Sequence, residues 1–126
     1  MKKLLTSIIA ILLFVTVYAQ NNKEYQITFI KELLVETRGI VSESNILTTD
    51  DGTPFNMVLA SLPLYYSFEL ITRKISTLVD SYSDVRITEP WKKIDNEGLI
   101  RCMVKVVDDY IVIYYSEPNN TIGFAF

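Results

Sequence analysis

Residues 99–126 read LIRCMVKVVDDYIVIYYSEPNNTIGFAF, and their apolar residues recur at every second position. A period of two is typical of β-strands, whereas acidic residues, proline and asparagine are typical of turns. Two such turn segments, residues 108–109 and 117–120, divide the stretch. The sequence therefore predicts a three-stranded antiparallel meander with strands at about residues 99–107, 110–115 and 121–126.

The two loops set the register of this predicted meander. With residues 108–109 as the first loop, Val106 pairs with Ile111, and in the second hairpin Ile113 pairs with Phe124. A slip of one residue would turn every side chain to the other face. Both hairpins place the same apolar set on one face, which we expect to meet the core: Ile100, Cys102, Val104, Val106, Ile111, Ile113, Tyr115, Ile122, Phe124 and Phe126.

Two amphipathic helices are predicted upstream of the meander. The first spans about residues 22–38, with Asn21 as N-cap and Glu24 in the capping-box position. The second runs from about residue 54 to residue 83, with a kink at Pro63, because proline lacks a backbone N–H and clashes with the preceding turn. Its apolar stripe comprises Leu64, Tyr65, Phe68, Ile71, Ile75, Leu78, Val79 and Tyr82.

Two segments between these elements are rich in turn formers. Residues 44–54 contain Asp50, Asp51 and Gly52 and are predicted to be a loop. Residues 83–98 are predicted to form a short helical turn and a loop. In that segment we expect Trp91 and Ile94 to cover the edge of the core, with ligand stacking on the indole as the alternative.

These elements together predict an α+β fold. Two amphipathic helices, the second kinked at a proline, pack on one face of the C-terminal three-stranded antiparallel meander, in the order α-α-β-β-β.

The N-terminus predicts export. Met1, Lys2 and Lys3 precede an apolar run from Leu4 to Val17, which is shorter than the roughly 20 residues of a membrane-spanning helix, and residues 17–19 form a small-residue cleavage site. We expect residues 1–19 to be a cleaved signal peptide, with a retained anchor as the alternative. Residues 20–126 then form a single small α+β domain, periplasmic or secreted, of a bacterial exported protein that does not insert into a membrane after cleavage.

The composition argues against an enzyme. The chain has no histidine, which removes Ser-His-Asp and Cys-His catalysis and the commonest ligand of transition metals. Its single cysteine, Cys102, has no partner for a disulfide or a zinc pair, and we expect it to be a buried apolar residue. No phosphate-binding or dinucleotide motif is present. We expect no catalytic site, no metal site and no cofactor.

The formal charge of −3 and the absence of a basic cluster disfavour nucleic acid as a partner. Two classes of function remain. The first is a protein-interaction protein, such as an inhibitor, an immunity-type protein or a subunit of an envelope complex. The second is a small carrier that holds an apolar ligand between helices and sheet.

The outer face of the meander is the candidate partner surface. Tyrosine and arginine are enriched where protein interfaces concentrate their binding energy. The alternative is a face that is merely solvated, or one covered by Trp91 and the preceding loop. The candidate partner-binding residues are Arg101, Lys105, Tyr110, Val112 and Tyr114.

Overall fold

The computed structural model describes residues 23–126. The predicted signal peptide and the predicted N-cap at Asn21 lie outside the described residues. Within residues 23–126 the elements follow in the order α2 (Lys23–Thr37), β1 (Ile40–Thr48), β2 (Pro54–Ser61), α3 (Phe68–Asp80), β3 (Val85–Lys93), β4 (Leu99–Val106), β5 (Asp109–Ser116) and β6 (Thr121–Ala125).

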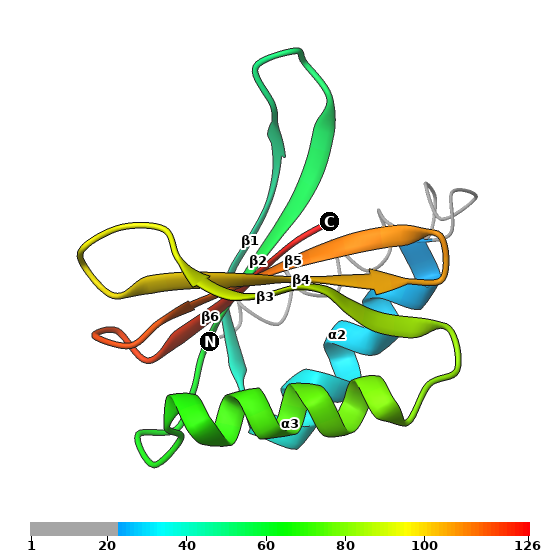
Figure 1. The fold of residues 1–126 in the computed structure, drawn as a ribbon. Coiled ribbons are helices and arrows are strands. Elements are labelled where there is room, and N and C mark those ends of the chain that lie inside the picture. The colour runs from blue at the N-terminus through cyan, green and yellow to red at the C-terminus, as the bar shows by residue number, and fades with distance from the viewer. Residues whose placement is uncertain (1–22) are drawn as a thin grey trace.

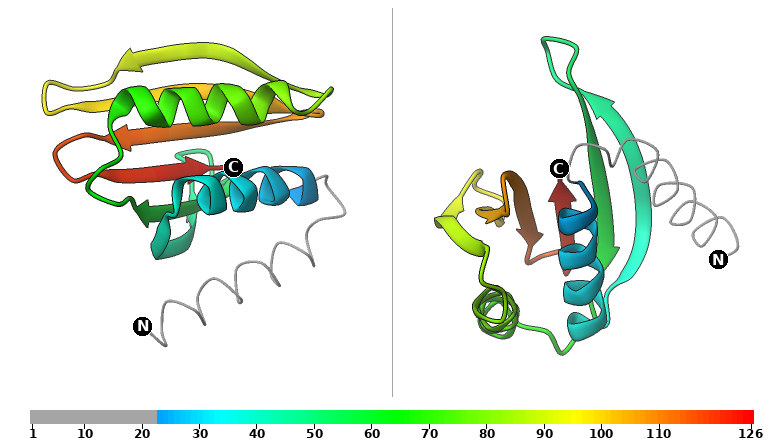
Figure 2. Two further views of the ribbon diagram at one scale, coloured as in Figure 1. Left: turned by 90° about the horizontal axis from the view of Figure 1, so that it is seen from below. Right: turned by 90° about the vertical axis from the view of Figure 1, so that its right-hand side faces the viewer.

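The described strands form one six-stranded sheet in the order β1-β2-β6-β5-β4-β3, and every neighbouring pair is antiparallel. Both helices lie on the same side of this sheet, as the two figures of the ribbon show (Figures 1 and 2). The α+β class and the one-sided helices are as the sequence predicts. The three-stranded meander is wrong, because the three predicted strands are only half of a larger sheet.

Strands β1 and β2 lie beside β6 and were not predicted. They come largely from residues that the sequence predicts as a loop and as the start of the second helix. Residues 40–61 form a β-hairpin whose turn contains Gly52, with φ at +86°. The backbone N–H of Thr49 donates to Thr53 O at 2.9 Å and closes the turn. Pro54 is the first residue of strand β2, where its lack of a backbone N–H costs the sheet no hydrogen bond. The predicted loop over residues 44–54 is thus confined to the turn at residues 49–53, because residues 44–48 belong to β1, and the helix predicted over residues 54–61 is wrong.

The second helix is shorter than predicted and has no proline kink. Helix α3 begins after Ser67, whose side chain accepts a hydrogen bond from Leu70 N at 3.2 Å. Pro63 lies in the connection between β2 and α3, where it interrupts no helical hydrogen bond. The apolar stripe from Phe68 onward is confirmed, and Ile71 and Ile75 are fully buried.

Helix α2 matches its prediction closely, since it spans Lys23–Thr37. It ends because Arg38 adopts a left-handed conformation with φ at 55°. The N–H of Gly39 then donates to Leu34 O at 2.9 Å and the N–H of Arg38 to Val35 O at 3.2 Å. These two bonds form the Schellman arrangement that ends helices. The chain turns there into β1.

Strand β3 replaces the helical turn and loop predicted over residues 83–98. Pro90 lies in this strand, which is tolerated because β3 is at the edge of the sheet. Trp91 is half-buried and packs edge-on against the Phe68 ring, with 5.6 Å between centroids, as expected for a residue at the core edge. Ile94 was expected beside it and is instead 44% exposed.

The β4–β5 turn differs from the predicted one by one residue. Val106 pairs with Asp109, so that Val107 and Asp108 are the loop residues. Val107 takes φ at 58°, and its N–H donates to Asp84 O at 2.8 Å, which holds it beside the start of β3. Each pairing partner moves by two residues, so every side chain keeps its predicted face.

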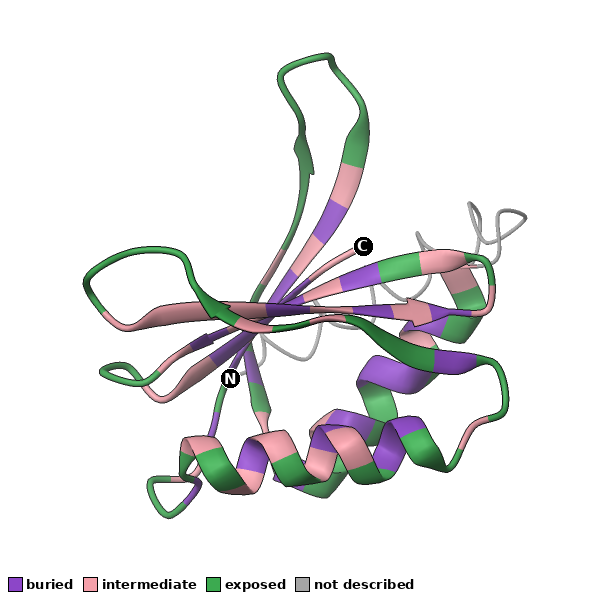
Figure 3. Cartoon of the chain, in the orientation of Figure 1, coloured by how far each residue is buried: buried purple, intermediate pink, exposed green. Residues whose placement is uncertain are grey.

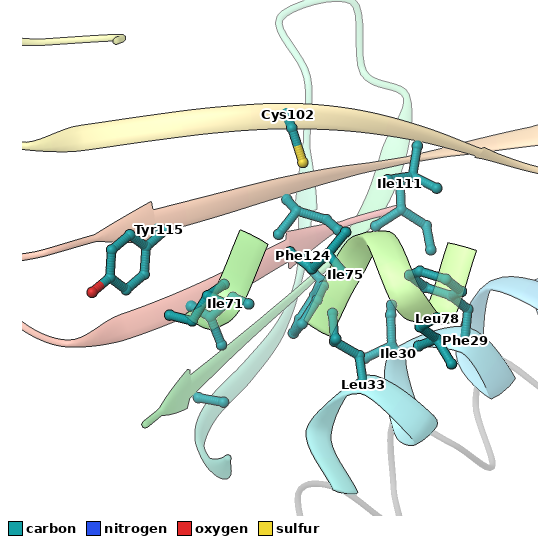
Figure 4. Packing of buried hydrophobic residues seen from close by; sticks show 14 of the residues in the cluster. Phe29, Ile30, Leu33, Ile71, Ile75, Leu78, Cys102, Ile111, Tyr115 and Phe124 are labelled. Carbon is teal, nitrogen blue, oxygen red and sulfur yellow. The ribbon is translucent and has the colours of Figure 1, made fainter. Parts of the chain in front are cut away.

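The β5–β6 register is the predicted one over most of its length, with Ile113 opposite Phe124. The predicted core face of the meander is confirmed: its central residues are buried, and Ile100 and Phe126 pack against the cluster from the rim. Figure 4 shows the helices contributing the facing side chains Phe29, Ile30, Leu33, Ile71, Ile75 and Leu78. Cys102 is 1% exposed within this core, as expected.

Candidate functional site

The five predicted partner-binding residues all lie on the sheet face opposite the helices, here called the outer face. Arg101 and Lys105 are on β4, and Tyr110, Val112 and Tyr114 are on β5. Their neighbours along each strand, such as Cys102, Val104, Ile111 and Ile113, point into the core. The structure therefore brings these five side chains onto one surface.

Because the β4–β5 turn is displaced by one residue, Arg101 and Lys105 have different partners on β5 from those that the predicted turn implies. Arg101 lies opposite Tyr114, and Lys105 lies opposite Tyr110. The Nζ atom of Lys105 is 5.8 Å from the centroid of the Tyr110 ring, within the range of a cation–π contact. Tyr110 is 47% exposed, whereas Arg101, Val112 and Tyr114 are half-buried.

Strands β6 and β2 continue this surface. Tyr114 lies opposite Gly123, and Gly123 lies opposite Leu59. A Cβ on residue 123 would come 2.8 Å from the Cδ2 atom of Leu59, so the absence of a side chain on Gly123 lets Leu59 rest on the backbone of β6. In the next row Val112 lies opposite Ala125, and Ala125 opposite Met57. The small residues of β6 allow long apolar side chains of β2 to approach β5.

These rows define the apolar centre of the outer face. Its members are half-buried side chains of four neighbouring strands that neither helix covers. They are Met57 and Leu59 of β2, Ala125 of β6, Val112 and Tyr114 of β5, and Met103 of β4.

A cationic border adjoins the apolar centre on the β3 side. Arg86 lies opposite Lys105, and Lys92 lies opposite Arg101. Glu89, opposite Met103, is the acidic residue between them. The Nε atom of Arg101 is buried and has no hydrogen-bond partner among residues 23–126. Four cations therefore share one edge of the outer face.

Several residues of this surface were missed by reasoning from the sequence. Met57 and Leu59 had been placed in a helix, and Arg86 and Lys92 in a loop. One signal in the sequence marks β2: Asp51-Gly52 lies between two segments rich in β-branched and apolar residues, a pattern typical of a hairpin. No comparable signal marks β3, which carries proline and many charges.

The surroundings of several described side chains shift their pKa values. Burial raises the pKa of the Cys102 thiol to about 12, so the thiolate nucleophile is suppressed at neutral pH. A hydrogen bond to the Glu32 carboxylate, followed by burial, raises the pKa of Tyr82 to about 12. Hydrogen bonds from the Thr49 and Thr53 side chains lower the pKa of Asp51, which is a fully exposed turn residue.

Within residues 23–126 no group of three or more acidic, cysteine or histidine side chains could hold a metal ion. No helix in the described segment has the length and apolar character needed to cross a bilayer.

The space between helices and sheet is filled by side chains. Phe29, Leu33, Ile75, Ile113 and Phe124 meet there, and each is at most 1% exposed. Two depressions of ≈ 400 Å³ and ≈ 340 Å³ lie elsewhere, on the surface. The larger adjoins the cationic border and is lined by Ser83, Asp84, Val85, Arg86, Lys105, Val107 and Asp108, and the smaller lies along the outward side of α2.

The chain was compared with protein-family models, curated proteins and solved structures, and none of the three comparisons gave a match.

Proposed function

We propose that this chain is a non-catalytic protein-interaction protein and that the outer face of its sheet binds the partner. The single observation that carries the proposal is the apolar centre, which extends over four strands and which, within residues 23–126, neither α2 nor α3 covers. The N-terminal sequence supports action outside the cytoplasm, in the periplasm or as a secreted protein. An inhibitor, an immunity-type protein and a subunit of an envelope complex all fit this description.

The physical argument begins with the two faces of the sheet. An antiparallel sheet with one solvated face normally alternates apolar residues inward and polar residues outward. Strand β5 departs from this pattern, since Val112 and Tyr114 face outward between the buried Ile111, Ile113 and Tyr115. Contiguous apolar surface that no internal element covers is typical of protein interaction sites.

The charges around the apolar centre indicate the chemistry of the partner. Arg86, Lys92, Arg101 and Lys105 gather at one edge of a chain whose formal charge is −3. Complementary potentials across an interface accelerate association and select the partner. The partner surface that fits is therefore a protein surface with an apolar middle and carboxylates on one side.

Substitution on the outer face tests the proposal. Val112→Glu introduces a charge in the apolar centre, and Val35→Glu is its matched control, because Val35 is 76% exposed on α2. Both proteins are used as bait in cell-envelope and secreted fractions of the producing cell. We expect Val112→Glu to lose the partner that the unchanged protein and Val35→Glu retain.

A charge reversal and a stability measurement complete the test. Lys105→Glu should weaken partner recovery, whereas Lys31→Glu on the exposed side of α2 should not. Tyr114→Ala is compared with the unchanged protein for thermal stability and for partner recovery. If Tyr114→Ala loses stability while partner binding is intact, the outer face is internal packing and the proposal is wrong.

A further inference from the structure

The hairpin of β1 and β2 extends beyond the rest of the sheet. Strand β2 pairs with β6 only from Met57 to Ser61, and the last backbone bonds across this boundary join Asn56 to Phe126. The distal part of the hairpin therefore continues as a two-stranded arm, which projects away from the helices (Figure 1) and is largely exposed (Figure 3). Two-stranded hairpins on their own are marginally stable in water.

The outer edge of this arm is β1, and it carries apolar side chains into solvent. Ile46 and Leu47 are each 42% exposed, and Ile40 is 66% exposed. As the first strand in the sheet order, β1 has a neighbouring strand on one side only among residues 23–126. Its outward backbone groups are thus available to a further strand.

The opposite edge of the sheet shows how this chain protects an edge. Strand β3 carries Arg86, Pro90, Lys92 and Lys93, and its pairing with β4 is interrupted twice by irregularities. Charges, proline and bulges are the devices by which edge strands avoid pairing with other chains. Strand β1 has one charged residue, Glu43, and one irregularity near its start. The two edges are therefore built differently.

We propose that β1 pairs with β1 of a second copy of this chain, in antiparallel orientation about a two-fold axis at Asn45, so that the Asn45 residues of the two copies lie opposite each other. The two sheets then join into one across the axis. Because a two-fold axis perpendicular to a sheet leaves its faces unexchanged, both outer faces lie on the same side. The pairing is a β-augmentation in which each copy supplies the strand.

The charges at the two ends of β1 select a second copy in this orientation. The acidic turn residues Asp50 and Asp51 follow the distal end of the strand, and Arg38 precedes its near end. Asp50 and Arg38 are exposed. Antiparallel pairing places Asp50 of each copy about two residues, roughly 7 Å along a strand, from Arg38 of the other. Parallel pairing would instead place like charges together.

The proposal does not depend on the partner-binding function of the outer face. Loss of partner binding in Val112→Glu would leave it unaffected, because Val112 is on β5, separated from β1 by β6 and β2. A dimer would nevertheless present two outer faces to one partner assembly. The two proposals are therefore tested by different measurements.

The first test uses the protein as purified from the producing cell. Its mass in solution is measured by light scattering and sedimentation. Ile46→Lys places two lysines near the two-fold axis, where they repel each other. Ile87→Lys is the matched control, since Ile87 is 39% exposed on the protected edge strand β3. We expect two-chain masses for the unchanged protein and Ile87→Lys, and one-chain mass for Ile46→Lys.

The second test exchanges charges and does not rely on Ile46→Lys folding normally. Arg38→Asp and Asp50→Arg should each weaken dimerisation by about threefold to tenfold, the size expected for two symmetric exposed ion pairs. The double variant should return to within about twofold of the unchanged protein, and the single effects should shrink at high salt. A one-chain mass for the unchanged protein at all concentrations, or no recovery in the double variant, would overturn the proposal.

Discussion

The Cδ2 atom of Leu59 lies 2.8 Å from the point that a Cβ atom on Gly123 would occupy, so the leucine side chain rests on a glycine of the neighbouring strand. Gly123→Ala must therefore displace Leu59 on the outer face. The displaced atom is the end of a flexible side chain, and Gly→Ala also reduces the entropy of the unfolded chain. We expect the free energy of unfolding to change by less than about 1 kcal/mol, while partner binding weakens.

A double-mutant cycle separates these two effects. In a Leu59→Ala background there is no Cδ2 atom for the alanine to meet, so Gly123→Ala should be neutral or stabilising by a few tenths of a kcal/mol. Chemical denaturation of the four proteins measures the coupling. If Gly123→Ala changes the free energy of unfolding equally in both backgrounds, the contact with Leu59 is not the reason that glycine occupies position 123.

Asn120 connects two loops that are distant in sequence. Its Nδ2 atom donates to Leu62 O at 3.0 Å and to Pro63 O at 2.6 Å, and its backbone φ of 47° suits asparagine. Removal of the amide leaves both carbonyls without these donors. We expect Asn120→Ala to lower the free energy of unfolding by about 2 kcal/mol in urea denaturation.

The adjacent asparagine supplies the control. The side chain of Asn119 is exposed and donates to Ser116 Oγ at 3.1 Å within its own turn. Asn119→Ala should cost less than about 0.5 kcal/mol. If the two alanine variants are equally stable, Asn120 does not join the β2–α3 connection to the β5–β6 turn.

The parts of the fold that the sequence predicts correctly are those with a single clear period. Helix α2 and the stripe of α3 show helical spacing, and in residues 99–126 apolar residues recur at every second position between clear turn segments. Two hairpins with short loops then fix which face is buried, even though the first turn is displaced by one residue. The five candidate residues consequently lie on the predicted face.

The remaining strands lack such a signal. Residues 54–61 are apolar on both faces, because Val58 and Ala60 enter the core while Met57 and Leu59 belong to the outer face. A short apolar run of this kind does not distinguish a strand from a buried helix. Thr53-Pro54 also resembles a helix start. Strand β3 is polar because it is an edge, and its place beside β4 follows from tertiary contacts alone.

Val107 is a β-branched residue at φ 58°, a conformation that valine adopts at a cost. It lies first in the two-residue β4–β5 loop, where positive φ is usually supplied by glycine or asparagine. The half-buried side chain of Val107 packs against the core cluster. Loss of this packing offsets part of the stability that a replacement gains by relieving the backbone strain. We expect Val107→Asn to raise the free energy of unfolding by up to about 1 kcal/mol.

Thermal and chemical denaturation measure this change. Val112→Asn is the control, because Val112 lies within β5 and has no left-handed backbone to relieve. That variant should be destabilised, since asparagine is disfavoured in strands. A loss of stability in Val107→Asn equal to that of the control would show that the turn holds valine without strain.

Cys102 should make the stability of the fold sensitive to alkaline pH. Burial raises the pKa of its thiol from the ordinary value of 9.0 to about 12, so the folded protein keeps the proton over a range in which the unfolded chain loses it. The unfolded state then binds fewer protons, and the free energy of unfolding falls as pH rises from 9 toward 12. Tyr82 contributes in the same direction, because hydrogen bonding to Glu32 raises its pKa from 10.0 to about 12.

Cys102→Ala tests this pH dependence. The substitution should lower the free energy of unfolding by about 1 to 2 kcal/mol at pH 7. It should also remove the contribution of the thiol to the pH dependence, so that the free energy of unfolding falls less steeply above pH 9 than in the unchanged protein. Denaturation of both proteins across this range measures the difference, and thiol labelling at pH 8 should be slow until the protein unfolds. Parallel pH profiles, or rapid labelling of the folded protein, would contradict a buried, protonated Cys102.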